Sequence, residues 1–160
     1  MSDADEHRQL LLMRAGAHAF AVYADEADGV VAWREPAPLP HAPPAVVGVV
    51  GVRGRMRTVL DPAALPGLPT PARPDGERGE AAHRLVVVLR GDEQLALAVS
   101  HAEPCAAPPD LAPTDPPAPF IRAALRHGAD TVYLLDPAHL FAAATHGTER
   151  RRQREVTGDK

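Results

Sequence analysis

The side chains that could perform chemistry in this 160-residue sequence are few, and their spacing forms no catalytic set. Its eight histidines are scattered, and none pairs with another at the spacing of a helical metal site. Ser100 and His101 are neighbours on a predicted strand, so their side chains point to opposite faces. Cys105 is the sole cysteine, which excludes an internal disulfide. We therefore predict no enzyme, no metal and no cofactor.

Residues 48–54 are spaced with glycines like a phosphate-binding loop, but the context of such a loop is missing. The segment lacks a Lys-Ser/Thr pair and leads into a predicted strand instead of a helix. Arg53, Arg55 and Arg57 alternate here, so on a strand they would share one face. This pattern predicts either a solvated strand face or a basic recognition surface.

Charge and hydropathy narrow the class of protein further. The formal net charge of -4 at pH 7 gives no global attraction to nucleic acid. Residues 1–8 are polar, unlike a signal peptide, and no stretch approaches the roughly 18 apolar residues of a membrane span. The basic residues 150–154 are typical of a solvated, disordered terminus. We expect a cytoplasmic protein with no direct membrane insertion and no nucleic-acid partner.

The elements that must position these residues are predicted to be mainly β-strands. Apolar and β-branched runs between turn residues predict strands over 10–14, 19–23, 46–52, 56–60, 85–89, 95–99 and 131–135. Eighteen prolines argue against long helices, and the proline-rich stretches 65–79 and 104–119 are expected to be a linker and an extended edge. Short strands with turn signals between them indicate an all-β fold, a small barrel or a sandwich.

Short helices are predicted over 24–28, 120–126 and 137–144. The last begins with Asp136 as a plausible N-cap and Pro137 at the first helical position. A weak internal echo, strand, glycine turn and strand, relates residues 10–22 to residues 86–97 and suggests two similar β modules.

The order and content of these segments resemble the CheW-like family, the chemotaxis coupling proteins and the regulatory domains of chemotaxis histidine kinases. Val46-Val47-Gly48-Val49-Val50-Gly51-Val52-Arg53-Gly54 resembles the family's "Val-x-Gly-Val-x-Asn-Leu-Arg-Gly" signature. Val59-Leu60-Asp61 resembles its "Val-Ile-Asp-Leu" strand end, and residues 134–140 resemble its closing "Leu-Leu-Asp-x-x-x-Leu". The match runs from about Gln9 to Phe141, most of the chain.

The resemblance implies two small SH3-like, five-stranded β-barrels on a shared core. It places the family domain over residues 9–145, between a polar tail at 1–8 and a basic, disordered tail at 146–160. Within the domain the expected parts are a first barrel at about 10–66, a linker at 66–82, a second barrel at about 83–135 and a C-terminal helix at 137–144.

The resemblance also implies a function, that of a non-catalytic adaptor between a methyl-accepting chemotaxis receptor and the regulatory domain of a histidine kinase. The partner-binding residues it implies are Arg53, Gly51, Val52, Gly54, Arg55 and Ala27. Arg53 matches the arginine of the family signature and is expected to act at the surface without a structural role. An arginine suits this task because it can contact a partner's carboxylate with two hydrogen bonds.

Several polar positions of the family pattern differ in this chain. Gly51 stands for an Asn, Gly29 for a Glu, Ser100 for an Asp, and Pro62-Ala63 for Leu-Arg. These differences predict either an adaptor that keeps its receptor but has reduced kinase contact, or an adaptor whose partners have changed in step with it.

The sequence is also compatible with two alternatives. One is a small-molecule-binding or accessory β-barrel subunit with a pocket between its modules. The other is a nucleic-acid-binding barrel that uses the Arg53, Arg55 and Arg57 face. The acidic net charge and the scarcity of aromatic side chains stand against the second.

Overall fold

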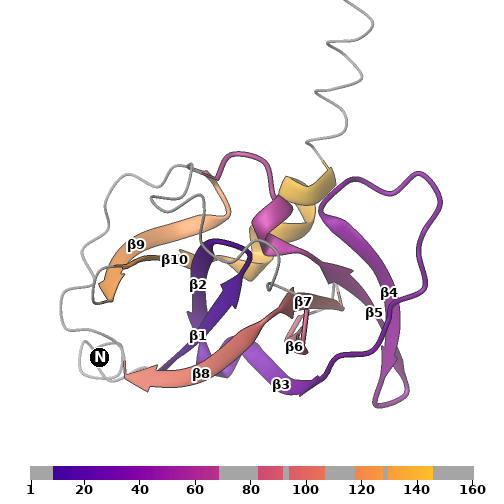
Figure 1. Ribbon diagram of the computed structural model, residues 1–160, viewed down its shortest axis with the longest axis horizontal. Helices are drawn as coiled ribbons and strands as arrows, with labels where there is room; N and C mark the ends of the chain where they lie inside the picture. Colours follow the sequence, from indigo (N-terminus) through magenta and orange to yellow (C-terminus); the bar gives the residue numbers. More distant parts are fainter. Residues whose placement is uncertain (1–8, 69–82, 92–93, 107–117, 128–129, 146–160) are drawn as a thin grey trace, which may run out of the picture.

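The computed structural model describes residues 9–68, 83–91, 94–106, 118–127 and 130–145, which fold into two five-stranded sheets (Figure 1). The strands of these residues are β1 (Gln9–Ala15), β2 (His18–Tyr23), β3 (Ala27–Ala32), β4 (Val46–Val52), β5 (Arg55–Leu60), β6 (Leu85–Leu89), β7 (Leu95–Val99), β8 (His101–Ala106), β9 (Ile121–His127) and β10 (Asp130–Leu135). Two short 3-10 helices, η1 (Ala24–Glu26) and η2 (Pro62–Ala64), and a C-terminal helix over residues 137–145 complete the described part.

Each sheet forms one barrel-like unit, which confirms the all-β prediction. The first sheet has the strand order β8-β1-β2-β10-β9, and the second has the order β3-β6-β7-β5-β4. Each contains one parallel pair, β2 with β10 and β5 with β7, among antiparallel neighbours. We call these units the β1 barrel and the β3 barrel after their first strands.

The two barrels interleave along the sequence, and the expected division into successive barrels at 10–66 and 83–135 does not match this topology. The hairpin of β1 and β2 pairs with β8 and β10 from the C-terminal part of the chain. Strands β3 to β7 lie together in the other sheet. Pairing between segments about a hundred residues apart is a tertiary choice that no local pattern encodes.

The apolar side chains form three clusters, and the largest is shared by both barrels. One face of the β1 barrel buries Leu10, Ala21 and Leu134, and one face of the β3 barrel buries Val59, Val86 and Ala98. The opposite faces of both sheets meet in the third cluster, together with Leu140 and Ala144 of the C-terminal helix. The predicted shared core is therefore confirmed, and the helix belongs to it.

The predicted strands and the C-terminal helix are present, but β3, β8 and β9 were missed. Residues 121–127, most of which were predicted to be helical, form β9, because pairing with β10 outweighs a weak local preference. Of the helix predicted over 24–28, only η1 forms before β3 begins. Strand β8 tolerates Pro104 because it lies at the edge of its sheet. The remainder of the predicted linker and extended edge, 69–82 and 107–117, lies outside the described residues.

Candidate functional site

The tip of the β4–β5 hairpin carries most of the residues that the sequence singled out. Val52 and Arg55 pair across a two-residue turn made of Arg53 and Gly54. Both turn residues have positive φ, 52° and 78°, as a type I′ turn requires. Gly54 adopts this conformation freely, whereas a residue with a Cβ, such as Arg53, is strained there by about 1 kcal/mol. A long charged side chain in so unfavourable a position is a candidate functional group.

The Arg53 side chain reaches from the hairpin to β3. Its Nη1 donates to the carbonyl oxygen of Asp28 at 3.4 Å. Its Nη2 lies close to Gly29, since a Cβ built on that glycine would stand 3.0 Å from it and the guanidinium would have to shift by a few tenths of an ångström. The structure therefore brings the hairpin tip, from Gly51 to Arg55, next to the start of β3, where Ala27 is the first residue. The position at which the family pattern has a Glu therefore lies directly beside this guanidinium.

Asp28 is turned into the same region by an irregularity in β3. The register with β6 shifts between Ala27 and Gly29, so that Asp28 is an extra residue in the strand. Such β-bulges redirect side chains. The Asp28 carboxylate lies 3.9 Å from Arg57 Nη2 and 3.9 Å from Arg90 Nε. We call Asp28, Arg53, Arg57 and Arg90 the Asp28 cluster.

Arg57 overturns the idea of one basic strand face. Arg53 lies in the turn and is exposed, Arg55 is exposed near the hairpin tip, and Arg57 is only 7% exposed among the apolar side chains of the β3 barrel. Its Nη1 donates to the carbonyl oxygen of Leu89 at 3.3 Å, and its Nε has no hydrogen-bond partner among the described residues. The alternative of a nucleic-acid-binding face made of Arg53, Arg55 and Arg57 therefore loses its third arginine.

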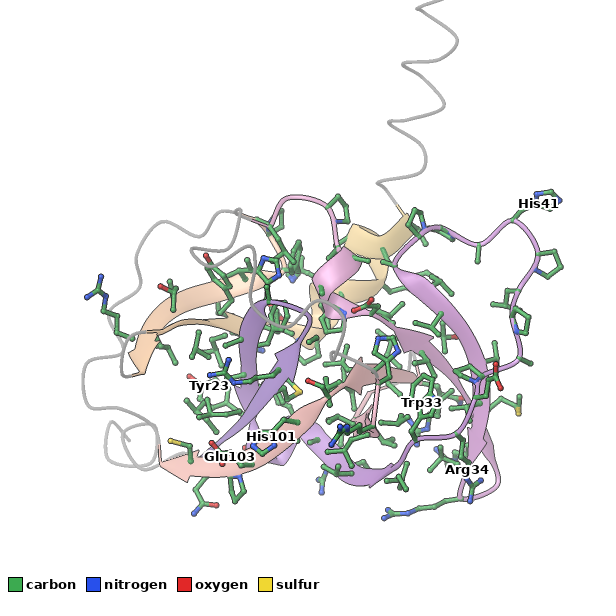
Figure 2. The ribbon with its side chains drawn as sticks, in the orientation of Figure 1. Tyr23, Trp33, Arg34, His41, His101 and Glu103 are labelled. Carbon is green, nitrogen blue, oxygen red and sulfur yellow. The ribbon has the colours of Figure 1, made fainter. Side chains whose placement is uncertain are left out.

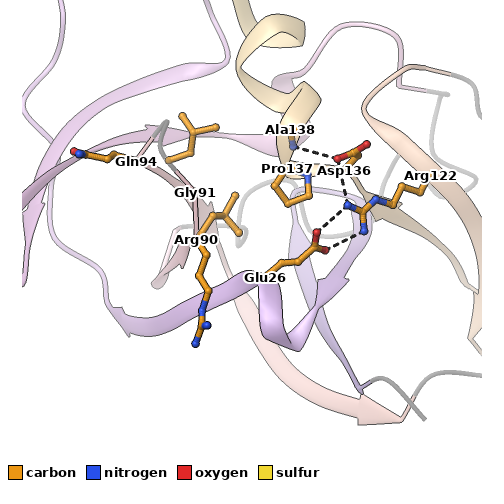
Figure 3. A pocket seen from close by; sticks show the side chains of 10 residues that line it. Glu26, Arg90, Gly91, Gln94, Arg122, Asp136, Pro137 and Ala138 are labelled. Carbon is orange, nitrogen blue, oxygen red and sulfur yellow. Dashed lines mark hydrogen bonds and ion pairs between the residues drawn. The ribbon is translucent and has the colours of Figure 1, made fainter. Parts of the chain in front are cut away.

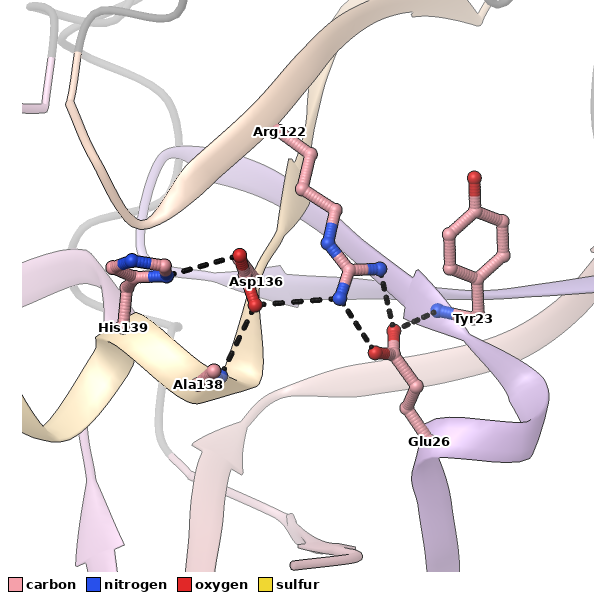
Figure 4. Close-up of polar contacts among 6 residues, drawn as sticks. All are labelled: Tyr23, Glu26, Arg122, Asp136, Ala138 and His139. Atoms are coloured by element: carbon pink, nitrogen blue, oxygen red, sulfur yellow. Dashed lines mark hydrogen bonds and ion pairs between the residues drawn. The ribbon is translucent and has the colours of Figure 1, made fainter.

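A second polar group, the Arg122 cluster (Arg122, Glu26 and Asp136), lies where the two barrels join (Figure 4). Arg122 of β9 contacts both oxygens of Glu26, through Nη1 at 3.1 Å and Nη2 at 2.8 Å. Its Nη2 also donates to Asp136 Oδ1 at 3.3 Å. Glu26 belongs to η1, which links β2 of one barrel to β3 of the other. One guanidinium thus connects this junction to β9 and to the start of the C-terminal helix.

Asp136 caps that helix as its sequence predicted. Its Oδ1 accepts from the backbone N–H of Ala138 at 3.1 Å, and its Oδ2 lies 3.0 Å from His139 Nδ1. Partial burial would raise the pKa of Asp136, but the charge of Arg122 and the hydrogen bonds from Ala138, His139 and Arg122 outweigh it and lower the pKa below its ordinary value. Burial likewise disfavours the charged form of Arg122, yet Glu26 and Asp136 raise the pKa of its guanidinium.

A cleft of about 360 Å³ opens beside these groups (Figure 3). Leu89, Arg90 and Leu95 of the β3 barrel line it, with Arg122 of the β1 barrel opposite. The carboxylates in its wall are already paired with Arg122. Arg90 belongs both to this cleft and to the Asp28 cluster, so the two features are contiguous.

Other polar contacts support the hairpin without joining the Asp28 cluster. Arg34, which follows β3, donates from Nη1 to the carbonyl oxygen of Gly51 at 3.2 Å (Figure 2). Trp33 packs against His83 with ring centroids 5.0 Å apart. A backbone bridge between Ala37 and Val49 adds a second link between the segment after β3 and β4. The Arg34 and Ala37 contacts join the segment after β3 to β4, the other edge strand of the same sheet.

Sequence reasoning missed Asp28, Glu26, Arg90 and Arg122 as members of a site. Glu26 and Arg122 are 96 residues apart, and no motif connects them. The local signal for Asp28, a charged residue between Ala27 and Gly29, is too common to indicate a bulge.

In the part of the chain that the structure describes, no helix is long and apolar enough to cross a membrane. Within the same residues, no three His, Cys, Asp or Glu side chains gather as metal ligands do.

The fold and the site define a double-barrel β module with charged groups at a hairpin tip and at the junction of its barrels. The CheW-like domain model matches residues 9–145, and the chain belongs to that family. A similar solved structure is that of the scaffolding protein TtCheW from Thermoanaerobacter tengcongensis, with a TM-score of 0.62, 15% sequence identity, 84% of this chain covered and 92% of that one. A comparison with curated proteins gave no match.

Proposed function

We propose that this protein is a non-catalytic chemosensory adaptor in the cytoplasm that couples a methyl-accepting receptor to the regulatory domain of a histidine kinase. Membership of the CheW-like family supports the assignment, as does the likeness in fold to a protein described as a scaffold. The observation that carries it is Arg53, an exposed arginine kept in a strained turn with a single long hydrogen bond to Asp28.

Arg53 is proposed as a partner-contacting residue of this adaptor. Its neighbours Gly51, Gly54 and Arg55 are exposed around it, and Ala27 is the first residue of the strand that its side chain reaches. Val52, which the sequence also suggested, is only 6% exposed within an apolar cluster of the β3 barrel and does not face a partner. Because its contact with Asp28 is long and uses only one of the guanidinium's five donors, the group is available for a carboxylate on a partner.

The test is to titrate the full chain against its cognate receptor tip and kinase regulatory domain. We expect Arg53→Ala to weaken binding by about 1–3 kcal/mol, as the loss of a hot-spot side chain does. Arg84→Ala, which removes an exposed arginine from the far end of β6, is the matched control. Unchanged affinity of Arg53→Ala for both partners contradicts the role of Arg53, and no binding by the unmodified chain contradicts the adaptor function.

Reduced kinase contact is proposed as a further property. Gly51 and Gly29 lack the side chains that the family pattern has beside Arg53, and each missing polar contact at a packed interface costs about 1–3 kcal/mol. The Leu-to-Pro difference at Pro62 gives this proposal little support. Pro62 is buried at the start of η2, where the N–H that proline lacks would have no helical partner. Equal affinity for the receptor tip and the kinase domain contradicts this selectivity.

A further inference from the structure

The Asp28 cluster has more positive than negative charge. Three guanidinium groups, those of Arg53, Arg57 and Arg90, approach the single residue Asp28. Arg53 contacts only its backbone oxygen, so that one carboxylate serves both Arg57 and Arg90.

This carboxylate pairs incompletely with each of its two arginines. Both distances are 3.9 Å, beyond the range of about 2.7–3.2 Å for a hydrogen bond between nitrogen and oxygen. Arg57 is buried, has one hydrogen bond to Leu89, and leaves Nε without a partner among the described residues. A buried charge with so little compensation is unfavourable unless another negative group approaches.

The exposure of the groups shows where such a negative group can approach. The Arg57 side chain lies inside the barrel, whereas the side chains of Arg90 and Asp28 are 64% and 40% exposed. Low-dielectric surroundings strengthen the field of a buried charge at the surface above it. Arg90 can therefore contact a ligand directly, while Arg57 attracts the ligand only through the field of its buried charge.

We propose that Arg90, Arg57 and Asp28 form a carboxylate site that accepts an acidic side chain of a protein partner. Arg90 contacts the incoming carboxylate, Arg57 is a positioning residue that supplies buried positive charge, and Asp28 is the resident carboxylate with which the newcomer competes. The location beside Arg53 favours a protein side chain over a free ion, and in that respect the inference rests on the proposed function.

Competition by Asp28 predicts that removing its charge strengthens the binding of an acidic ligand instead of weakening it. Removing a carboxylate from a site that only stabilises the fold would weaken the protein and gain nothing. If Asp28 competes, Asp28→Asn frees both guanidinium groups and strengthens the binding of an acidic ligand. Arg90→Gln must act in the opposite direction.

The experiment uses the full chain with nitrogen-labelled arginine and hexaglutamate as the probe, followed through the side-chain Nε–H resonances. We expect saturable shifts of the Arg90 and Arg57 signals. Asp28→Asn should lower the Kd about threefold to tenfold, and Arg90→Gln should raise it about threefold to tenfold, as pairing with one exposed charge allows. The control is Arg84→Gln, because Arg84 and Arg90 flank β6 at opposite ends. Arg84→Gln should leave the Kd unchanged.

Three results overturn the proposal: equal shifts with hexaglutamine, equal or tighter binding of inorganic phosphate, or weaker binding by Asp28→Asn that still melts like the unmodified chain. If Asp28→Asn does not fold, Arg90→Gln decides alone, because Arg90 is exposed. A second arm repeats the titrations with the receptor tip and the kinase domain. No binding of either by the unmodified chain contradicts the proposed function and leaves the hexaglutamate result standing. Binding that neither variant alters contradicts the carboxylate site and leaves the function standing.

Discussion

The Arg122 cluster and the Asp28 cluster contain the same chemical groups but pair them differently. Two carboxylates lie within 2.8–3.3 Å of the Arg122 nitrogens. Glu26 accepts two hydrogen bonds from this guanidinium, and Asp136 accepts one. In the Asp28 cluster one carboxylate lies 3.9 Å from each of two arginines. The Arg122 guanidinium is therefore paired with carboxylates of the protein itself, whereas Arg57 and Arg90 retain N–H donors without a close acceptor among the described residues.

This difference separates a structural role from a recognition role. The pairing of Arg122 joins β9 and the start of the C-terminal helix to η1, the element that links β2 of one barrel to β3 of the other. The incomplete pairing around Asp28 contributes little to stability, because ion pairs at that distance and exposure are weak. The following variants test whether the two clusters differ in this way.

Arg122→Met should cause the largest loss of stability. Glu26 and Asp136, both about one-fifth exposed, would lose their cation, and the free energy of unfolding should fall by about 2 kcal/mol. Urea unfolding measures the change. Arg126→Met is the control, since Arg126 is an exposed arginine of the same strand. Equal effects of the two substitutions would show that the pairing of Arg122 does not stabilise the fold.

Asp136 should contribute about 1 kcal/mol, in a manner that depends on pH. Its pKa is lowered in the folded protein, so its contribution is complete above the ordinary unfolded value near pH 4 and is lost as the pH falls through the lower folded value. Asp136→Asn keeps the cap and removes the charge. The variant should therefore be less stable than the unmodified chain at pH 7, and the difference should shrink below about pH 4. A difference that is independent of pH would assign the effect to the cap alone.

Arg57→Met should change the free energy of unfolding by less than about 1 kcal/mol, because an apolar side chain of similar length replaces a poorly compensated buried charge. Asp28 keeps Arg90 as its partner in this variant. Thermal and urea unfolding measure it. A loss as large as that of Arg122→Met would make Arg57 a structural residue and remove the contrast between the clusters.

Arg53→Asn should have the smallest effect on stability, a gain of about 0.5 kcal/mol, because Asn adopts the left-handed conformation of the type I′ turn more readily than Arg. The same variant should bind partners more weakly. A loss of stability would show that the contact of Arg53 with Asp28 holds the hairpin to β3.

The Asp28 cluster and the Arg122 cluster also differ in how much of each could be predicted from the sequence. The strands beside the hairpin tip were predictable, because residues 46–52 are rich in valine and residues 56–60 continue the apolar pattern. The turn at Arg53-Gly54 was not, since Arg53, Arg55 and Arg57 were expected to share one strand face. The N-cap at Asp136 was also predictable from a local pattern, because Asp136 and Pro137 are adjacent directly after a predicted strand. Glu26 and Arg122 were not, because their contact depends on β2 and β9 flanking β10 in one sheet.

The strands likewise differ in whether local sequence or distant pairing explains them. Strands with β-branched or alternating apolar residues were evident, whereas the alanine-rich β9 and the proline-containing β8 became strands through the partners that they pair with. Local preference is worth tenths of a kcal/mol per residue and gives way to ladder pairing and burial.

By itself, then, the sequence determined the all-β class, the strands on either side of Arg53, the capped helix and the family. Tertiary structure alone decided which strands share a barrel, that Arg57 lies inside one, and that a bulge turns Asp28 toward two arginines. The physical reason is range. Turns and caps depend on residues a few positions apart, whereas burial and charge pairing depend on segments that meet only when the two sheets close around their common core.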